Sequence, residues 1–302
     1  MNSWDLIIVG GGPAGLTAGL YACRAGLKTM LTERMFTGGQ SVTTELLENY
    51  PGFPAGISGV DIGLAMMEQA TKFGLTVQYE GVESLELAGP EKRVTTTGGV
   101  YTARTVILCM GAQPRTLGLP REEALRGKGV SYCATCDGAF FRDRDVAVVG
   151  GGDTACEDAL YLSRVARSVT LIHRRDTLRG SAILQQRIGQ RENIALLLES
   201  QVTELLGEDA LRAVKVQTPQ GSRELSVSGL FVAVGTTPMT ALVRDQLACD
   251  EAGYIRTDRA CRTSLEGVWA AGDIRDTVLR QVVTAAADGA IAATEAQRYL
   301  MG

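Results

Sequence analysis

Histidine is nearly absent from this sequence: His173 is the only one among 302 residues. A cysteine–histidine or serine–histidine nucleophile would have to use this residue, and so would a metal site with mixed histidine and cysteine ligands. Elsewhere in the chain, proton transfer must rely on carboxylates, tyrosines, lysines, thiols or water.

Long apolar runs and blocks of like charge are also missing. No run approaches the roughly 18 apolar residues that a membrane helix needs, and the N-terminus lacks the basic region of a signal peptide. The net charge is −4 with dispersed lysines and arginines, which argues against nucleic acid as a partner. The seven cysteines are an odd number, and most lie singly in apolar segments, unlike a secreted disulfide framework. We therefore expect a cytoplasmic protein that binds neither membrane nor nucleic acid.

A glycine-rich pattern occurs twice in a chain whose length favours about two domains. The segments "DLIIVGGGPAGLTAGLYACRAGLKTMLTER" and "DVAVVGGGDTACEDALYLSRVARSVTLIHRR" begin at residues 5 and 145. Each reads as a buried strand, a glycine turn, an amphipathic helix and a second strand, which is the context in which such a turn binds a dinucleotide. The small residues let the backbone approach a pyrophosphate at the helix N-terminus. The aligned turn residues are Gly10, Gly12 and Gly15 in the first copy and Gly150, Gly152 and Ala155 in the second.

The two copies differ at the end of the second strand, where Glu33 aligns with His173. An acid at this place accepts hydrogen bonds from ribose hydroxyls, as FAD or NAD requires. The second copy instead offers Arg174, Arg175 and Arg179, whose guanidinium groups suit the 2′-phosphate of NADP. Two adenine dinucleotides on one chain indicate a relay of electrons from a nicotinamide to a flavin.

The segment "GVSYCATCDGAFF" contains Cys133 and Cys136, which could hold a metal, form a structural disulfide or transfer electrons. A metal site needs more ligands than one cysteine pair supplies, and no metal is predicted. A structural disulfide across two residues would restrict the unfolded chain little. A redox dithiol suits the position between the two glycine motifs. Thiol–disulfide exchange needs a proton donor, and Asp137 is the nearest candidate.

From about residue 5 to its C-terminus, the chain closely resembles the low-molecular-weight, bacterial-type thioredoxin reductases. The resemblance rests on the following segments, in this order: "GGGPAG", "GGQ", "ENYPGFPAGISG", "CATCDG", "GGGDTA", "HRRDTLR", "VGTTP" and "AAGDIRDTVLRQVVTAAADG". It implies an α/β protein with two Rossmann-like dinucleotide-binding domains, each a three-layer ββα/βαβ arrangement. Residues 1–112 and 246–302 would form a discontinuous FAD domain. Residues 113–245, inserted between them, would bind NADPH and carry the cysteine pair.

The resemblance also assigns binding residues by their positions in these motifs. Those expected to bind FAD are Gly10, Gly12, Pro13, Ala14, Gly15, Glu33, Gly39, Gln40, Asn49, Val82, Gly111, Gly272, Asp273, Arg280, Gln281 and Val282. Those expected to bind NADPH are Gly150, Gly152, Asp153, Thr154, His173, Arg174, Arg175 and Arg179. The sequence departs from the family pattern at Met239 and at Gly180–Ser181. We expect Gly180 to loosen the arginine loop and to weaken the preference for NADPH.

The activity implied by the resemblance is that of a thioredoxin-disulfide reductase, working as a cytoplasmic homodimer. Electrons would pass from NADPH to FAD, then to the Cys133–Cys136 disulfide and finally to oxidised thioredoxin, with Asp137 as the acid–base group. Two alternatives remain: a flavin thioredoxin reductase fed by ferredoxin, and a flavin-dithiol redox sensor. A turnover assay with different electron donors distinguishes them.

Overall fold

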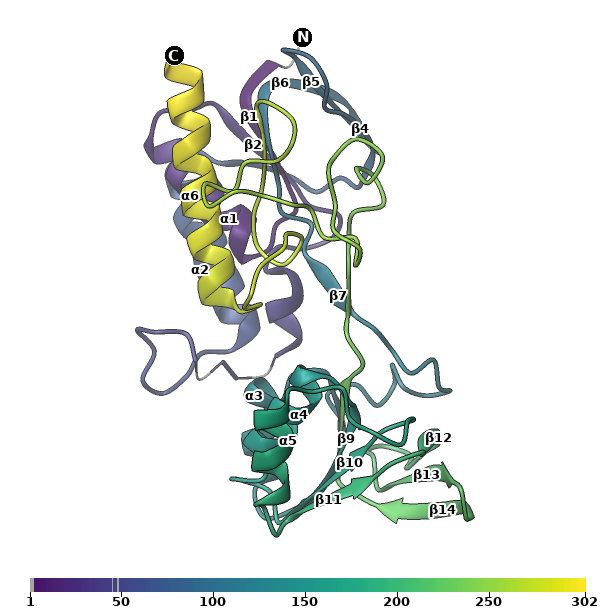
Figure 1. Ribbon diagram of the computed structural model, residues 1–302. Helices are drawn as coiled ribbons and strands as arrows, with labels where there is room; N and C mark the ends of the chain where they lie inside the picture. The colour runs from purple at the N-terminus through teal and green to yellow at the C-terminus, as the bar shows by residue number, and fades with distance from the viewer. Residues whose placement is uncertain (1–2, 45, 48) are drawn as a thin grey trace. The chain divides into compact units, whose positions relative to one another are not determined.

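The computed structural model of the protein describes residues 3–44, 46–47 and 49–302 (Figure 1). The chain folds into two compact units. The first comprises Met1–Gln113 and Thr237–Gly302, and the second, Pro114–Thr236, is inserted between these two segments.

A mainly parallel sheet forms the centre of the first unit. Its strands follow the order β3-β2-β1-β6-β5-β4, with β17 also paired to β6. Strands β1, β2, β3, β6 and β17 are parallel to their neighbours in this group, whereas β4 and β5 are added as an antiparallel meander. Apolar runs such as "LIIV" form the central strands because both of their faces are buried. The strand bounds are β1 Ser3–Val9, β2 Thr29–Thr32, β3 Thr76–Gln78, β4 Val82–Glu86, β5 Lys92–Thr96, β6 Gly99–Leu108 and β17 Val268–Ala270.

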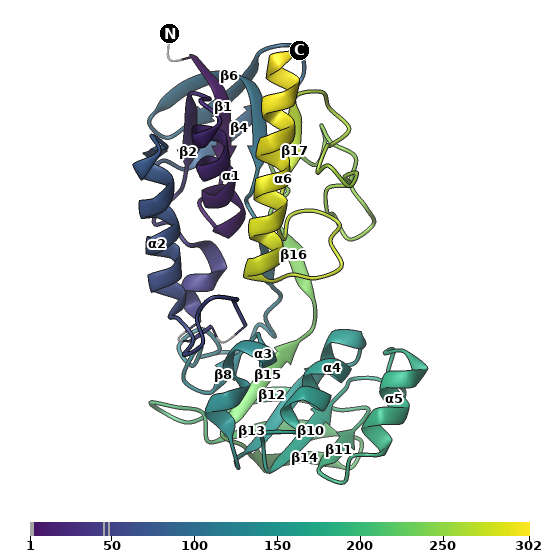
Figure 2. The ribbon, with the colours of Figure 1, turned by 90° about the vertical axis from the view of Figure 1, so that its left-hand side faces the viewer.

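Three helices, α1 (Pro13–Arg24), α2 (Gly59–Lys72) and α6 (Val282–Met301), cover one face of this sheet (Figure 2). Small residues at the crossing of α1 and α6 bring the two helices close together. A Cβ atom added to Gly289 would lie 2.1 Å from the carbonyl oxygen of Ala14. Although α6 has 20 residues, none of the helices within the described residues is long and apolar enough to cross a membrane.

The second unit repeats the layered arrangement around a five-stranded parallel sheet of order β11-β10-β9-β15-β8. Helices pack on one face of the sheet, and a three-stranded antiparallel sheet of order β12-β13-β14 packs on the other. The two α/β units confirm the predicted pair of Rossmann-like folds. The strands are β8 Val130–Ser131, β9 Asp145–Gly150, β10 Ser168–Ile172, β11 Ile194–Leu197, β12 Gln201–Leu206, β13 Ala213–Thr218, β14 Gly221–Ser226 and β15 Gly229–Ala233. The helices are α3 Ala134–Asp137, η2 Gly138–Phe141, α4 Asp153–Leu162 and α5 Ala182–Gly189.

The two chain crossings between the units pair with each other as the strands β7 (Ala112–Pro114) and β16 (Thr236–Pro238). The second crossing lies at 236/237, whereas the resemblance implied a boundary at 245/246. The earlier position follows from packing, since Val243 and Leu247 are buried in the apolar cluster of the first unit. Residues 237–245 therefore belong to the first unit.

Candidate active site

The first glycine motif forms the turn between β1 and α1. Gly10 has φ +105°, and a Cβ atom there would lie 2.5 Å from the carbonyl oxygen of Cys109. At Gly15 a Cβ atom would lie 1.9 Å from the carbonyl oxygen of Gly10, so no larger residue fits without a shift of the backbone. Pro13 is the first residue of α1, and no side chain caps the helix at Gly12. The N–H groups of the first helical turn are thus available to an anion such as a pyrophosphate.

Glu33, immediately after β2, turns its carboxylate toward this glycine turn. Its Oε2 accepts a hydrogen bond from the backbone N–H of Gly11 at 2.8 Å, and its Oε1 accepts one from that of Arg34 at 2.6 Å. A carboxylate retains further lone pairs that suit ribose hydroxyls, and its charge would repel a 2′-phosphate. The site fits the adenosine of FAD.

Two distant segments close around the same turn. A Cβ atom on Gly39 would lie 2.9 Å from the Cα of Gly12, and one on Gly272 would lie 3.0 Å from the Cβ of Ala14. The structure therefore brings the "GGQ" and "AAGD" segments to the N-terminus of α1. Among the other predicted FAD residues, Gln40 is exposed in the 3₁₀ helix η1 (Gly39–Thr43), Val82 begins β4 and Gly111 follows β6.

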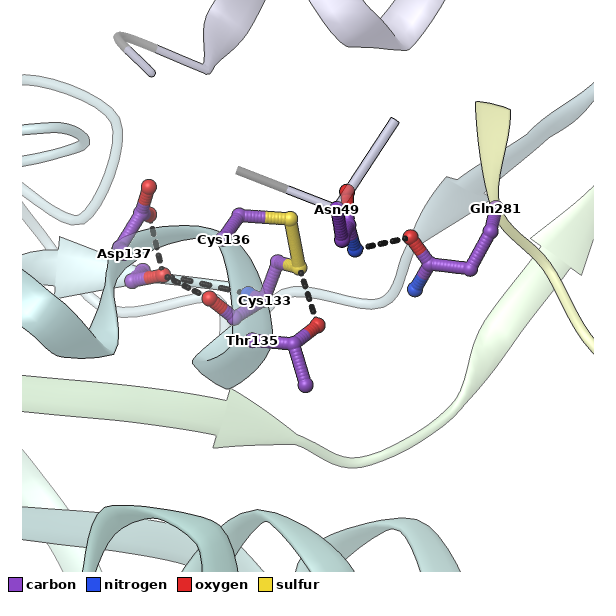
Figure 3. The surroundings of a disulfide bond; sticks show 7 residues. Asn49, Cys133, Thr135, Cys136, Asp137 and Gln281 are labelled. Carbon is purple, nitrogen blue, oxygen red and sulfur yellow. Dashed lines mark hydrogen bonds between the residues drawn. A yellow bond between two sulfur atoms is a disulfide. The ribbon is translucent and has the colours of Figure 1, made fainter. Parts of the chain in front are cut away.

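Asn49 and Gln281 lie side by side although they are far apart in the sequence (Figure 3). The Asn49 amide donates a hydrogen bond to the side-chain oxygen of Gln281 at 3.1 Å. Gln281 caps the N-terminus of α6, and its own backbone N–H donates to the hydroxyl of Thr284 at 3.1 Å. Val282 is then the first residue of α6. The "ENYPGF" segment begins at Glu48, which lies outside the described residues.

Asp273 and Arg280 share a partly buried, charged region of the first unit. Burial raises the pKa of the Asp273 carboxyl to about 6; Arg280 opposes this shift and Asp288 adds to it. The Arg280 guanidinium lies over the Tyr254 ring, 4.1 Å from its centre, and its Nε is buried without a hydrogen-bond partner in the described part of the chain. A buried donor of this kind calls for an acceptor, which a bound ligand can supply. These residues fit the binding of FAD.

An ion pair that was not predicted from the sequence supports this loop. The carboxylate of Asp288, on α6, accepts hydrogen bonds from the backbone N–H of Gly272 at 3.1 Å and from Arg275 at 3.0 Å. Arg275 also donates to the hydroxyl of Thr257 at 2.6 Å. The available signal was an arginine and an aspartate within the "AAGDIRDTVLRQVVTAAADG" segment. Tyr254 gave no comparable signal.

In the second unit, the glycine motif forms the turn between β9 and α4, and no side chain caps α4 at Gly152. The backbone N–H groups of Arg179 and Gly180 both donate to the carbonyl oxygen of Gly151, at 2.6 and 3.0 Å. The carboxylate of Asp153, the first residue of α4, accepts from the backbone N–H of Ser181 at 2.6 Å, and Thr154 follows it at the surface. The arginine-bearing loop is therefore tied to the glycine turn.

The expected loosening by Gly180 is wrong. Gly180 is buried, and a Cβ atom there would lie 2.6 Å from the sulfur of Cys156 on α4. Glycine at this position permits close packing of the loop on the helix, instead of adding freedom. Its effect on the choice of nucleotide stays a prediction.

The arginine cluster surrounds the only histidine. His173 is buried, and burial together with the charges of Arg179, Arg175 and Arg174 lowers its pKa, although a backbone hydrogen bond with Gly150 opposes this shift. The imidazole is consequently neutral at pH 7, and its buried Nε2 has no hydrogen-bond partner within the described residues. The three arginines are exposed. This cluster offers positive charge to an anionic group such as the 2′-phosphate of NADPH.

Cys133 and Cys136 form a disulfide with an S–S distance of 2.08 Å at the start of α3 (Figure 3). Both residues are half-buried. Asp137 follows directly, and its Oδ2 accepts a hydrogen bond from the hydroxyl of Ser131 at 2.6 Å. The backbone N–H of Cys133 donates to the same hydroxyl at 3.1 Å. Ser131 therefore links the disulfide to the predicted acid–base group. This connection was not predicted, although Ser131 lies only two residues before Cys133 in the sequence.

The sequence pattern of the pyridine nucleotide-disulphide oxidoreductases matches residues 4–289. The chain belongs to this family. It is 48% identical to the thioredoxin reductase of Mycolicibacterium smegmatis, over 98% of this chain and 96% of that protein. It is 46% identical to the bifunctional thioredoxin reductase/thioredoxin of Mycobacterium leprae, over 98% of this chain and 66% of that protein. The crystal structure of thioredoxin reductase from Streptococcus pyogenes matches with a TM-score of 0.90 and 43% identity, over 99% of this chain and 98% of that one.

These comparisons confirm the class that the sequence predicted. The chain is an oxidoreductase of the disulfide-reducing type, its cofactors are FAD and NADPH, and its full-length relatives are thioredoxin reductases. The comparisons leave the assignment of single residues to each cofactor and to the reaction as a prediction.

Proposed function

We propose that the protein reduces the disulfide of a thioredoxin with electrons from NADPH. The observation that carries this proposal is the Cys133–Cys136 disulfide with Asp137 beside it, in the same unit as the arginine-lined nucleotide turn. The overall reaction is balanced, because NADPH and one proton supply the two electrons and two protons that convert a disulfide into two thiols. FAD, bound by the first unit, would supply the chemistry that carries the electron pair from the nicotinamide to the protein disulfide.

The residues of the first unit hold and orient FAD. The N-terminus of α1 at Gly12 receives the pyrophosphate, and the Glu33 carboxylate accepts hydrogen bonds from the ribose. Arg280 and Asp273 supply a buried donor and a carboxylate to the polar part of the flavin chain. The ion pair of Asp288 and Arg275 keeps their loop in place.

In the second unit, the N-terminus of α4 receives the pyrophosphate of NADPH, and Arg174, Arg175 and Arg179 bind the 2′-phosphate. After reduction, one thiolate of the pair attacks a sulfur of the thioredoxin disulfide and forms a mixed disulfide. The second thiolate then attacks the mixed disulfide and re-forms the Cys133–Cys136 bond. Asp137 delivers the proton that each departing substrate sulfur needs.

The choice of electron donor tests this function against the two alternatives. We expect rapid loss of flavin absorbance on addition of NADPH, followed by turnover with a purified thioredoxin, and much slower reaction with NADH. A protein that is active only with reduced ferredoxin would be the ferredoxin-fed enzyme. Reduction by NADPH without turnover of any disulfide protein would indicate a sensor.

An apolar groove on the first unit supports assembly as a homodimer, which the resemblance also implies. Helices α1, α2 and α6 form the groove, and two of the side chains that line it, Tyr21 and Phe53, are 44% and 37% exposed. A second copy of the chain would bury these apolar side chains, and their removal from water would stabilise the dimer. The residues that line the groove include Leu16, Leu20, Tyr21, Phe53, Ile62 and Met66. We expect light scattering to give twice the mass of the chain, and Tyr21→Glu to give a monomer; a monomeric wild type would contradict the proposal.

We also propose a cytoplasmic location, because NADPH and reducing conditions support a dithiol that must be oxidised and reduced repeatedly.

A further inference from the structure

The hydroxyl of Ser131 lies at the centre of the hydrogen bonds around the disulfide. Ser131 is 4% exposed, and its Oγ is 2.6 Å from Oδ2 of Asp137, 3.1 Å from the backbone nitrogen of Cys133 and 3.3 Å from the Cys133 carbonyl oxygen. One side chain therefore contacts both the predicted acid–base group and the first cysteine of the pair.

Neighbouring contacts hold the segment of chain that carries this hydroxyl. Ser131 ends β8, where it pairs with Phe231 of β15 at the edge of the parallel sheet. The next residue, Tyr132, donates a hydrogen bond to the carboxylate of Glu122 at 2.8 Å. Glu122 is itself 4% exposed and accepts from the backbone N–H of Leu117 at 2.8 Å. The backbone on both sides of Ser131 is thus held by the second unit itself.

A hydroxyl has one proton to donate and can accept two hydrogen bonds, so it can serve both protonation states of a neighbouring acid. When Asp137 is ionised, Ser131 donates to its carboxylate. When Asp137 is protonated, Ser131 can accept the acid proton and turn its own proton to the Cys133 carbonyl oxygen. In both states it accepts from the backbone N–H of Cys133.

We infer that Ser131 is a positioning residue of the thiol–disulfide exchange, which keeps Asp137 and the Cys133 backbone in place while Asp137 gains and loses its proton. The inference rests on the proposed function. In each exchange the Cys133–Cys136 dithiol is oxidised to a disulfide and the thioredoxin disulfide is reduced to a dithiol. Two protons pass from the enzyme thiols to the substrate sulfurs, and Asp137 carries them in turn. Loss of the hydroxyl leaves Asp137 in the chain but removes the group that orients it.

A double-mutant cycle of Ser131→Ala and Asp137→Asn tests this inference. The measured quantity is the rate at which NADPH-reduced enzyme reduces thioredoxin in a single turnover. We expect Ser131→Ala to lower this rate about tenfold, a part of the roughly 10²–10⁴-fold that general acid–base help contributes. In the Asp137→Asn background the same change should alter the rate by less than about twofold. Ser131→Thr, which restores the hydroxyl, should recover most of the rate.

A pH profile separates positioning from a general loss of structure. A hydrogen bond donated to the charged carboxylate lowers its pKa, so Ser131→Ala should move the limb of the profile that reports the ionisation of Asp137 to higher pH. The matched control is Ser168→Ala, which removes a 2.7 Å serine–aspartate hydrogen bond to Asp145 elsewhere in the same unit. FAD content and the reduction of the flavin by NADPH should be unchanged in all variants.

Equal rate losses in the two backgrounds, or no loss in Ser131→Ala, would overturn the inference. Either result, with a wild type that reduces thioredoxin, leaves the proposed function in place. A wild type that reduces no thioredoxin would instead refute the proposed function.

Discussion

The carboxyl group of Asp273 should make FAD binding depend on pH. Burial raises its pKa to about 6, so in the free protein it is mostly protonated below that pH. A flavin-chain hydroxyl that donates to the carboxylate favours the ionised form and lowers this pKa in the complex. The affinity for FAD should therefore fall as the pH drops through about 6, by at most about tenfold per pH unit.

Fluorescence titration of the apoprotein with FAD between pH 5 and 8 measures this effect. Asp273→Asn cannot ionise, and its affinity should stay flat over the same range. A wild-type affinity that does not change between pH 5 and 7 would show that Asp273 does not receive the flavin chain.

Arg174 and Arg175 should determine the preference for NADPH. Each charged hydrogen bond to the 2′-phosphate contributes roughly 1.5–3 kcal/mol, so replacing both arginines with alanine should raise the KM for NADPH about tenfold or more. The KM for NADH should change little, because NADH lacks this phosphate. Steady-state kinetics with both donors measure the ratio, and Arg187→Ala, which removes an exposed arginine from α5, is the control. An equal rise in KM for NADPH and for NADH would show that these arginines do not bind the 2′-phosphate.

At the scale of secondary structure elements, the crossing of α1 and α6 couples the fold to the flavin site. Gly289→Ala would place a methyl carbon only 2.1 Å from the carbonyl oxygen of Ala14. This distance is too short for a van der Waals contact, so the two helices must move apart. We expect a loss of roughly 1–3 kcal/mol in the free energy of unfolding, as for overpacked cores, together with weaker FAD retention. Gly189→Ala in α5 is the control, because a Cβ atom there meets nothing within 4 Å. Denaturant unfolding that gave the same stability for both variants would contradict this coupling.

The sequence predicted these elements well where one local signal was sufficient. Apolar runs marked β1 and β9, the glycine turns marked the starts of α1 and α4, and Glu33 marked the end of β2. The hydrogen bonds from Ser131 to Asp137 and from Gly272 to Asp288 were not predictable. They depend on how separate segments meet in three dimensions, and serine and aspartate are equally common in exposed loops that bind nothing.

At the scale of the whole molecule, the repeated motif predicted two α/β units, and the resemblance to thioredoxin reductases implied that one is inserted in the other. The predicted end of the insertion differs from the observed end by nine residues. The glycine and proline residues near 235–238 and the segment after them both have the composition of a linker, so the sequence did not show where the second unit ends. Burial of Val243 and Leu247 in the first unit decided the boundary. Gly180 was misread for a related reason, since sequence alone does not distinguish a glycine that adds freedom from one that permits close packing.

The central claim is that electrons leave the protein through the Cys133–Cys136 pair. The most direct test is NADPH-dependent reduction of thioredoxin by the Cys133→Ser/Cys136→Ser variant, with FAD content and flavin bleaching measured in the same preparation. We expect FAD to stay bound and to be reduced by NADPH, since the nucleotide sites are intact, while thioredoxin reduction falls to background. Thioredoxin turnover that persists in this variant would show that the electrons leave by another route.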